Sequence, residues 1–175
     1  MAEHHRPPGP LSCLGIAVVL ATVVVDQASK QWAEASLPTG EAIDLLPILT
    51  LYRVHNPGIA FSFPAGLGGL PLIAITLGVM AVVLMFWRTA HDGGRWAPIG
   101  YALIIGGALG NLIDRIVHGH VVDFLLLHVG DRTLFVFNLA DAALTLGPAI
   151  LIVVYLFAGR GTADAPFMLL SPPPP

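Results

Sequence analysis

Two aspartates, Asp123 and Asp141, lie in apolar surroundings where a carboxyl group is costly to keep ionised. Asp123 interrupts the run Val121-Val122-Asp123-Phe124-Leu125-Leu126, and Asp141 lies at the start of a long hydrophobic segment. Because an ionised carboxylate beside hydrocarbon is expensive, such residues are expected to face a protein interior and to serve a function. Two of them near one membrane face predict a pair that shares a proton and activates water.

The composition of this 175-residue chain is that of a membrane protein. Hydrophobic residues make up 55% of the sequence, charged residues only 11%, and the mean hydropathy is +0.79. A soluble domain of this size has roughly a quarter of its residues charged. The 8 Lys and Arg residues form no basic run, so nucleic acid is not a predicted partner. The single cysteine, Cys13, excludes an intramolecular disulfide.

Four segments are long enough to cross a bilayer core, which takes about 20 mostly apolar residues. Their predicted bounds are residues 11–33, 70–87, 97–113 and 139–158. We therefore predict an all-α polytopic membrane protein with four transmembrane helices, forming a single membrane-embedded domain over residues 1–160. The proline-rich residues 161–175 are expected to be a disordered tail.

The arginines that flank these spans slightly favour both termini in the cytoplasm. The two longer loops then face the outer side. The first contains the strand-like run Ile48–Val54 and the turn Asn56-Pro57-Gly58, which predict a small β element at the membrane surface. The second has apolar runs on both sides of Gly130-Asp131-Arg132, and fits either a hairpin or a re-entrant piece packed under the helices.

Ionisable residues near the ends of the spans need an explanation. Asp26 precedes Lys30 by four residues, the favourable order for a salt bridge within a helix, and Lys30 could in addition orient a group in a site. Asn111 shares a helical face with Asp114 and Arg115 at the end of the third span. We expect Arg115 to pair with the free carbonyls of this helix end. Asn111 and Asp114 either fix the helix end or support a site.

Asn138 and Asp141 have the spacing of a helix N-cap and an acid in the first turn. The helix dipole favours a negative charge at Asp141, so capping alone explains both residues. It does not explain Asp123, which has no partner nearby in the sequence. If Asp123 and Asp141 reach the same depth, their environments can separate their proton affinities and supply an acid and a base. The spacing leaves both interpretations open.

Other kinds of catalytic site have less support. His118, His120 and Asp123 form H-x-H-x-x-D, which matches none of the helical zinc-protease motifs and has no cysteine to assist it. Ser29 and Ser62 lack an obvious base, and no G-x-S-x-G is present. We therefore predict neither a metal nor another cofactor.

The main rival function is a small transporter or proton-conducting protein that uses the intramembrane acids as a relay. These acids cluster toward one membrane face, whereas a relay needs groups spread through the depth of the membrane. The spans also lack the paired broken helices of inverted-repeat transporters. A third possibility is a non-catalytic assembly protein, which would tolerate asparagine at Asp123 and at Asp141.

Five blocks of polar and small residues occur in order between about residues 15 and 158. They are Asp26-Gln27-Ala28-Ser29-Lys30, Asn56-Pro57-Gly58-Ile59-Ala60-Phe61, Gly110-Asn111-Leu112-Ile113-Asp114-Arg115, Val121-Val122-Asp123-Phe124 and Phe137-Asn138-Leu139-Ala140-Asp141. The series resembles the lipoprotein signal peptidases (signal peptidase II). Each block is a weak signal alone, but five in order on a four-span frame are highly specific.

The resemblance implies an aspartic endopeptidase of the bacterial cytoplasmic (inner) membrane, with its active site and the small β element toward the periplasmic face. We expect a monomer, because one chain would complete the site. It implies membrane lipid around the protein and diacylglyceryl-prolipoprotein substrates, cut just before the lipidated cysteine. Asp123 and Asp141 would be the catalytic pair, and the loop 56–61 would clamp the peptide. The residues implied to bind substrate or support the site are Asn56, Gly58, Asn111, Arg115, Asn138 and Ala140. Those implied to hold its architecture are Asp26, Lys30 and Asp114.

Overall fold

A computed structural model describes residues 7–58 and 69–158 of the chain. Its elements, in chain order, are α1 (Cys13–Ser36), β1 (Ile43–Leu46), β2 (Leu49–Asn56), α2 (Leu70–Thr89), α3 (Trp96–Val117), β3 (Val121–Val129), β4 (Arg132–Phe137) and α4 (Leu139–Ala158). Within the described ranges, four helices are long and apolar enough to cross a membrane. Their ends lie within four residues of the predicted ones. The predicted tail lies outside the described residues, and the single domain stays a prediction.

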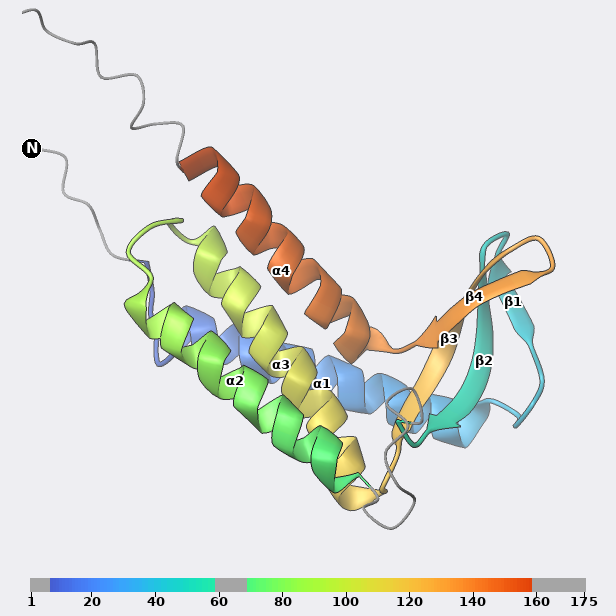
Figure 1. Cartoon of the computed structure of the whole chain (residues 1–175). Coiled ribbons are helices and arrows are strands. Elements are labelled where there is room, and N and C mark those ends of the chain that lie inside the picture. The colour runs from blue at the N-terminus through green and yellow to red at the C-terminus, as the bar shows by residue number, and fades with distance from the viewer. Residues whose placement is uncertain (1–6, 59–68, 159–175) are drawn as a thin grey trace, which may run out of the picture.

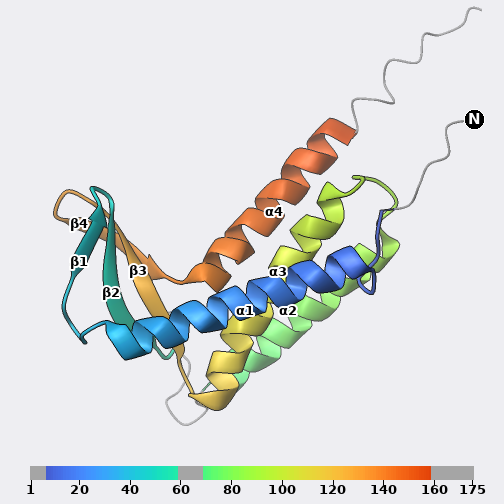
Figure 2. The same ribbon diagram turned by 180° about the vertical axis from the view of Figure 1, so that it is seen from behind.

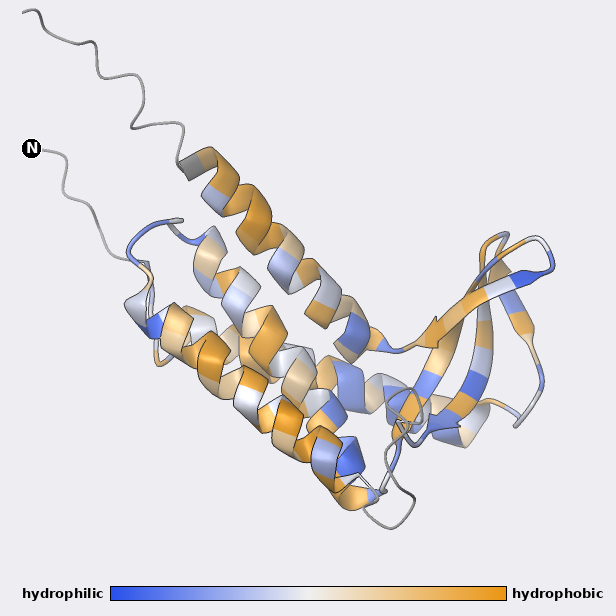
Figure 3. Ribbon diagram, in the orientation of Figure 1, coloured by the Kyte–Doolittle hydropathy of each residue, from blue (hydrophilic) through white to orange (hydrophobic). Residues whose placement is uncertain are grey.

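Helix α3 is the central helix and packs against α1, α2 and α4 (Figures 1 and 2). Of its most apolar stretch 72% is buried, against 11–17% in the other three helices. The outer faces of α2 and α4 are strongly hydrophobic (Figure 3), and α1 also exposes large apolar side chains, among them Leu20, Val24 and Trp32. Apolar side chains that face outward along the full length of a helix suit contact with lipid, where close packing rather than hydrophobicity holds helices together.

Glycines in α3 allow this close packing. A Cβ added at Gly106 would lie 2.7 Å from the Cβ of Thr22 in α1, and one added at Gly107 would lie 2.5 Å from the backbone oxygen of Ala140 in α4. Both distances are too short for real atoms. Any side chain at these positions would push α1 or α4 away from α3, and with them the polar residues that these helices carry.

The strands form one antiparallel sheet in the order β1-β2-β3-β4. The predicted β element in the first long loop is present as β1 and β2, and the second loop forms the hairpin alternative, β3 and β4. The predicted four helices and small β element are confirmed, but that the two loops join in one sheet was not predicted. Pairing of β2 with β3 links segments about 70 residues apart, and no local pattern specifies it.

The sheet is attached to the helices at one end of the bundle, where α1 ends and α4 begins (Figures 1 and 2). A small core holds it there, made by Ala33 and Leu37 of the α1 end with Leu51 and Phe124 of the sheet. Trp32 also packs edge-on against Phe124, with 6.5 Å between the ring centroids. This core fixes β3, and therefore the residue next to Phe124, which is Asp123.

Candidate active site

Asp123 is a buried residue of β3 whose two carboxylate oxygens both accept hydrogen bonds. Its Oδ1 accepts from Asn138 Nδ2 at 2.7 Å, and its Oδ2 accepts from Asn56 Nδ2 at 3.0 Å. The strand register explains the second contact. Val54 pairs with Asp123 and Asn56 pairs with Val121, so Asn56 and Asp123 are diagonal neighbours on one face of the sheet.

Asp141 lies in the first turn of α4 and is tied to the residue that caps this helix. The Asp141 backbone N–H donates to Asn138 Oδ1 at 2.9 Å, and the Asn138 backbone N–H donates to Asp141 Oδ2 at 3.3 Å. The predicted N-cap is therefore present. Asn138 also contacts Asp123 through its Nδ2, so one side chain both caps the helix and reaches the second carboxyl group.

Asn111 of α3 completes the connection between the two aspartates. Its Nδ2 donates to Asp141 Oδ1 at 2.7 Å, while its Oδ1 accepts from Asn138 Nδ2 at 3.1 Å and from Lys30 Nζ at 2.9 Å. Because an ammonium group only donates hydrogen bonds, Lys30 requires the Asn111 oxygen to face it, which turns the amide nitrogen toward Asp141. The order of contacts is Asp123, Asn138, Asn111, Asp141.

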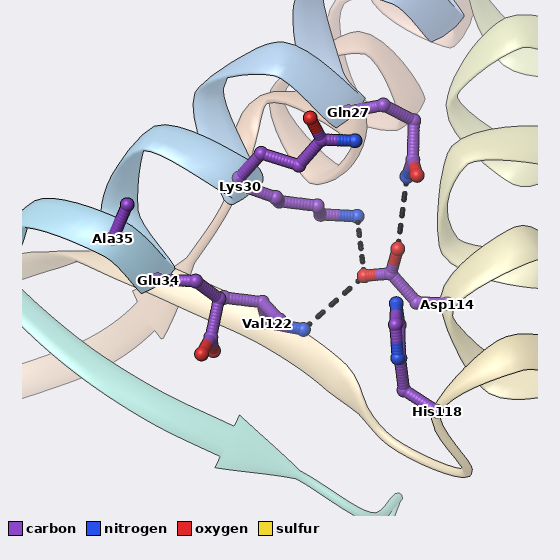
Figure 4. A pocket seen from close by; sticks show the side chains of 8 residues that line it. Gln27, Lys30, Glu34, Ala35, Asp114, His118 and Val122 are labelled. Atoms are coloured by element: carbon purple, nitrogen blue, oxygen red, sulfur yellow. Dashed lines mark hydrogen bonds and ion pairs between the residues drawn. The ribbon is translucent and has the colours of Figure 1, made fainter.

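Lys30 is also the centre of a buried ion cluster. Its Nζ lies 2.8 Å from Asp26 and 3.0 Å from Asp114, which confirms the predicted Asp26–Lys30 salt bridge and adds a second acid. Asp26 Oδ1 accepts from the Ala140 backbone N–H at 2.9 Å, and Asp114 Oδ2 accepts from the Val122 backbone N–H at 3.2 Å (Figure 4). The cluster therefore holds the start of α4 and the start of β3 in one place.

Gln27 belongs to this cluster, although no role was predicted for it from the sequence. Its Nε2 donates to Asp114 Oδ1 at 2.8 Å (Figure 4). The same nitrogen also donates to the Gly110 carbonyl at 3.2 Å. These two partners lie more than 80 residues away in α3, so only the polarity of the Gln27 side chain inside an apolar span could have pointed to its role. Gln27 borders a polar pocket of about 370 Å³. The residues that line this pocket are Gln27, Lys30, Gln31, Glu34, Ala35, Asp114, His118 and Val122.

Arg115 does not pair with the last carbonyls of α3, and that expectation was wrong. The carbonyls of Asp114 and Arg115 accept from the backbone N–H groups of His118 and Gly119, at 2.8 and 3.2 Å. Gly119 has φ +75°, a conformation that suits glycine and closes the helix end. Arg115 Nη1 instead donates to the Asn111 carbonyl at 3.1 Å.

A groove of about 260 Å³ lies between α2, α3 and α4 and reaches Asp141. Asn111, Arg115 and Asp141 supply its polar groups. The rest of its lining is mostly apolar and consists of Leu72, Ile75, Thr76, Val79, Ala108 and Leu144. The groove can take an apolar chain and present a polar group of that chain to the Asp141 carboxylate.

The environment of Asp123 changes its acidity. Burial raises the pKa of Asp123 to about 6, and the negative charge of Asp141 acts in the same direction. Hydrogen bonds from Asn56 and Asn138 and the positive charge of Lys30 act in the opposite direction, because they favour the ionised carboxylate. A carboxyl group with a pKa near neutrality can hold or release a proton under ordinary conditions, as acid–base catalysis requires.

Gly58 fixes the orientation of the Asn56 amide. The Gly58 N–H donates to Asn56 Oδ1 at 2.9 Å, which leaves the Asn56 nitrogen to face Asp123. Gly58 has φ +83°, and a Cβ there would collide with the side chain of Leu72, so this position requires glycine. Half of the predicted clamp over residues 56–61, namely residues 59–61, lies outside the described residues.

The histidines singled out from the sequence stack on one another. The ring of His120 lies 4.3 Å from that of His55 and 6.0 Å from that of His118, measured between centroids. Over residues 7–58 and 69–158, no three His, Cys, Asp or Glu side chains are close enough together to hold a metal ion. In particular, His118, His120 and Asp123 do not converge.

These features define an integral membrane protein with two aspartates at one end of a four-helix bundle, joined to each other through hydrogen bonds of Asn138 and Asn111. The family model described as Signal peptidase (SPase) II matches residues 18–157 of the chain. The chain is 50% identical over 136 residues to the lipoprotein signal peptidases of Brucella ovis and Brucella suis, which covers 78% of this chain and 85% of theirs.

Solved structures agree with this similarity. Two bacterial membrane enzyme structures obtained by the in meso method, at 2.3 and 1.9 Å resolution, each superpose with a TM-score of 0.74. They are 24% and 25% identical in sequence, and the match covers 91% and 87% of this chain and 98% of each of theirs. The chain belongs to the signal peptidase II family. It is therefore a multi-pass membrane peptidase of lipoprotein processing.

Proposed function

We propose that the chain is an aspartic endopeptidase that cuts diacylglyceryl-modified prolipoproteins just before the lipidated cysteine. The observation that carries this proposal is the linked pair Asp123 and Asp141, joined through Asn138 and Asn111 beside an apolar groove. Two carboxyl groups in different environments can divide the roles of acid and base between them. Family membership supplies the substrate class.

The environments of the two aspartates favour one assignment of roles. Asp141 accepts two hydrogen bonds and lies at the amino end of α4, where the helix dipole favours a negative charge. Asp141 is therefore the base that takes a proton from water, and the resulting hydroxide attacks the scissile carbonyl carbon. Asp123 retains a proton and donates it toward the carbonyl oxygen. Asp141 then passes its proton to the amide nitrogen, which breaks the C–N bond, and a hydroxyl of the diol returns a proton to Asp123 as the new carboxyl group forms.

The groove between α2 and α4 suits a hydrophobic substrate. At the end of this groove that is farthest from Asp141, the same three helices border a second apolar groove of about 540 Å³, lined by Val83, Phe86, Tyr101, Ile104, Leu151, Ile152, Tyr155 and Leu156. An apolar chain bound along α3 would bring a bond at its outer end to Asp141. Arg115 Nε is buried and has no hydrogen-bond partner among the described residues, which leaves it available to a substrate carbonyl.

The arrangement of the elements supports an orientation in the inner membrane. The start of α1, the end of α4 and the connection from α2 to α3 lie at one end of the bundle, and the sheet lies at the other (Figure 1). Arg88 and Arg95 flank that connection, and arginines favour the cytoplasmic side. We infer that both termini are cytoplasmic and that the sheet and the aspartates face the periplasm. Because one chain supplies every group of the site, a monomer suffices.

The proposed specificity is tested with two synthetic peptides of one sequence, with and without diacylglycerol on the cysteine. We expect purified protein in detergent to cut the lipidated peptide and to leave the cysteine as the new amino terminus, as read by mass spectrometry. Equal cleavage of the unmodified peptide, or a cut elsewhere, would contradict the proposed specificity.

The pH dependence of cleavage tests the roles of the two aspartates. Because Asp123 must carry its proton and its pKa is about 6, we expect kcat/KM to fall as the pH rises through about 6. The midpoint belongs to the coupled pair rather than to one residue. The measurement is kcat/KM between pH 4.5 and 8.5. A rise through this midpoint would instead make Asp123 the base.

A further inference from the structure

The end of α1 and the end of β2 are joined by a polar contact that the proposed chemistry does not use. Glu34, in the last turn of α1, accepts hydrogen bonds from two residues of β2. Its Oε1 lies 2.6 Å from His55 Nε2, and its Oε2 lies 3.2 Å from Arg53 Nη1. Arg53 Nη1 also donates to the Glu34 backbone carbonyl at 2.6 Å. The second guanidinium nitrogen of Arg53 bonds Thr39, just beyond the helix.

This contact depends on an irregularity in the sheet. Between the pairs Leu51–Leu125 and Val54–Asp123, strand β2 contains one residue more than β3. Such a bulge changes the face on which the following side chains emerge. After it, Asn56 shares a face with Asp123, while His55 points to the opposite face.

On that opposite face, His55 lies between two neighbours. The His55 Nε2 bonds the Glu34 carboxylate, and the His55 ring stacks on the His120 ring with 28° between the planes. In Figure 4 the Glu34 carboxylate extends away from Asp114 and toward β2. The charged and titratable groups around this contact are Glu34 of α1, Arg53 and His55 of β2, and His118 and His120 of the turn before β3.

We propose that Glu34 and His55 are positioning residues, which fix the end of β2 against α1 and thereby hold the Asn56 amide on the Asp123 carboxylate. His55 and Asn56 are adjacent in the strand, so a displacement of one moves the other. This inference rests on the proposed function only in assigning a catalytic role to Asp123. The contacts themselves do not depend on that role.

The contact is suited to positioning rather than to stability. The Glu34 and His55 side chains are 40% and 46% exposed, and exposed ion pairs contribute little to the free energy of folding. Loss of the Asn56 hydrogen bond has a different consequence. That bond favours the ionised form of Asp123, so weakening it raises the pKa of Asp123. Loss of the exposed Glu34–His55 contact is therefore expected to raise the pKa of the buried Asp123.

The test compares Glu34→Ala and His55→Ala with the parent by pH profile. We expect the midpoint near pH 6 to move up by about half a pH unit, which is about a threefold change in relative kcat/KM above the midpoint. The double variant should shift no further than either single one. Glu34→Gln should restore part of the shift, because its amide oxygen can accept one of the two bonds. Asn56→Ala is the positive control and should shift at least as far.

Glu41→Ala is the matched control, since Glu41 is exposed and makes no hydrogen bond or ion pair with the described residues. Its midpoint should match that of the parent. If Asn56→Ala moves the midpoint and Glu34→Ala does not, the positioning role is overturned. If Glu41→Ala moves it equally, the effect is one of surface charge and the role is likewise overturned.

A second readout separates this inference from the proposed function. The protonated Asp123 carboxyl group can be titrated by its infrared C=O band, assigned by the loss of that band in Asp123→Asn. An upward shift of this titration in Glu34→Ala supports positioning even in a protein that cuts no substrate. An unchanged titration in Glu34→Ala overturns the positioning role even if the protein cuts substrate.

Discussion

Asp123→Asn and Asp141→Asn are each expected to lower kcat/KM for a diacylated prolipoprotein peptide by about 10³-fold, within the range found for loss of a general acid or base. An amide can neither take a proton from water nor supply one to the carbonyl oxygen. The variants should remain folded, because asparagine keeps the size of the side chain and part of its hydrogen bonding. The measurement is peptide cleavage in detergent, with chelator present throughout, alongside thermal unfolding.

Asp131→Asn is the matched control, because Asp131 lies exposed in the turn between β3 and β4 and should tolerate the same change. Robust cleavage by either variant would remove that aspartate from the chemistry. Asp114 would then be the next candidate, although its bonds to Lys30, Gln27 and the Val122 backbone already give it a positioning task. Loss of parental activity to the chelator would redirect attention to a metal.

Lys30→Met is expected to cause the largest loss of stability. Lys30 is 3% exposed and is the cation between Asp26 and Asp114. Its removal leaves two buried carboxylates without a counter-charge, a change that typically costs about 3–5 kcal/mol. It also frees the Asn111 oxygen that Lys30 orients, so activity should be lost together with stability. The measurement is thermal unfolding in detergent, followed by tryptophan fluorescence.

Two further variants make this prediction specific. Arg88→Met removes an exposed cation at the end of α2 and should leave the unfolding temperature almost unchanged. Asp114→Asn combined with Lys30→Met should recover part of the lost stability, because one of the two unpaired charges is then absent. A stable Lys30→Met protein, or a double variant less stable than the single one, would contradict the charge balance described for this cluster.

Features that depend on neighbours in the chain could be predicted from the sequence. The four helices were located within four residues because about 20 apolar residues in succession specify a span. The Asp26–Lys30 bridge and the Asn138 cap were also predicted, because helix geometry alone brings residues three and four apart together. Asp123 and Asp141 attracted attention because a carboxyl group is costly in apolar surroundings.

The surroundings of those aspartates depended on the tertiary fold. Asp123 contacts Asn56, which is 67 residues away, through a register that includes a bulge, and the sequence offered no signal for either. The expectation for Arg115 failed for a similar reason, since the chain after α3 turned back and closed its own helix end.

By itself the sequence determined the helices, their caps and the local ion pair, because these follow from the geometry of one continuous segment. Only the tertiary structure decided which distant groups meet. Glycines let α1 and α4 approach α3 closely enough for Lys30 to reach Asn111, and strand pairing joined both loops into one sheet. The physical reason is that such contacts depend on packing and register across the whole fold, which no short stretch of sequence specifies.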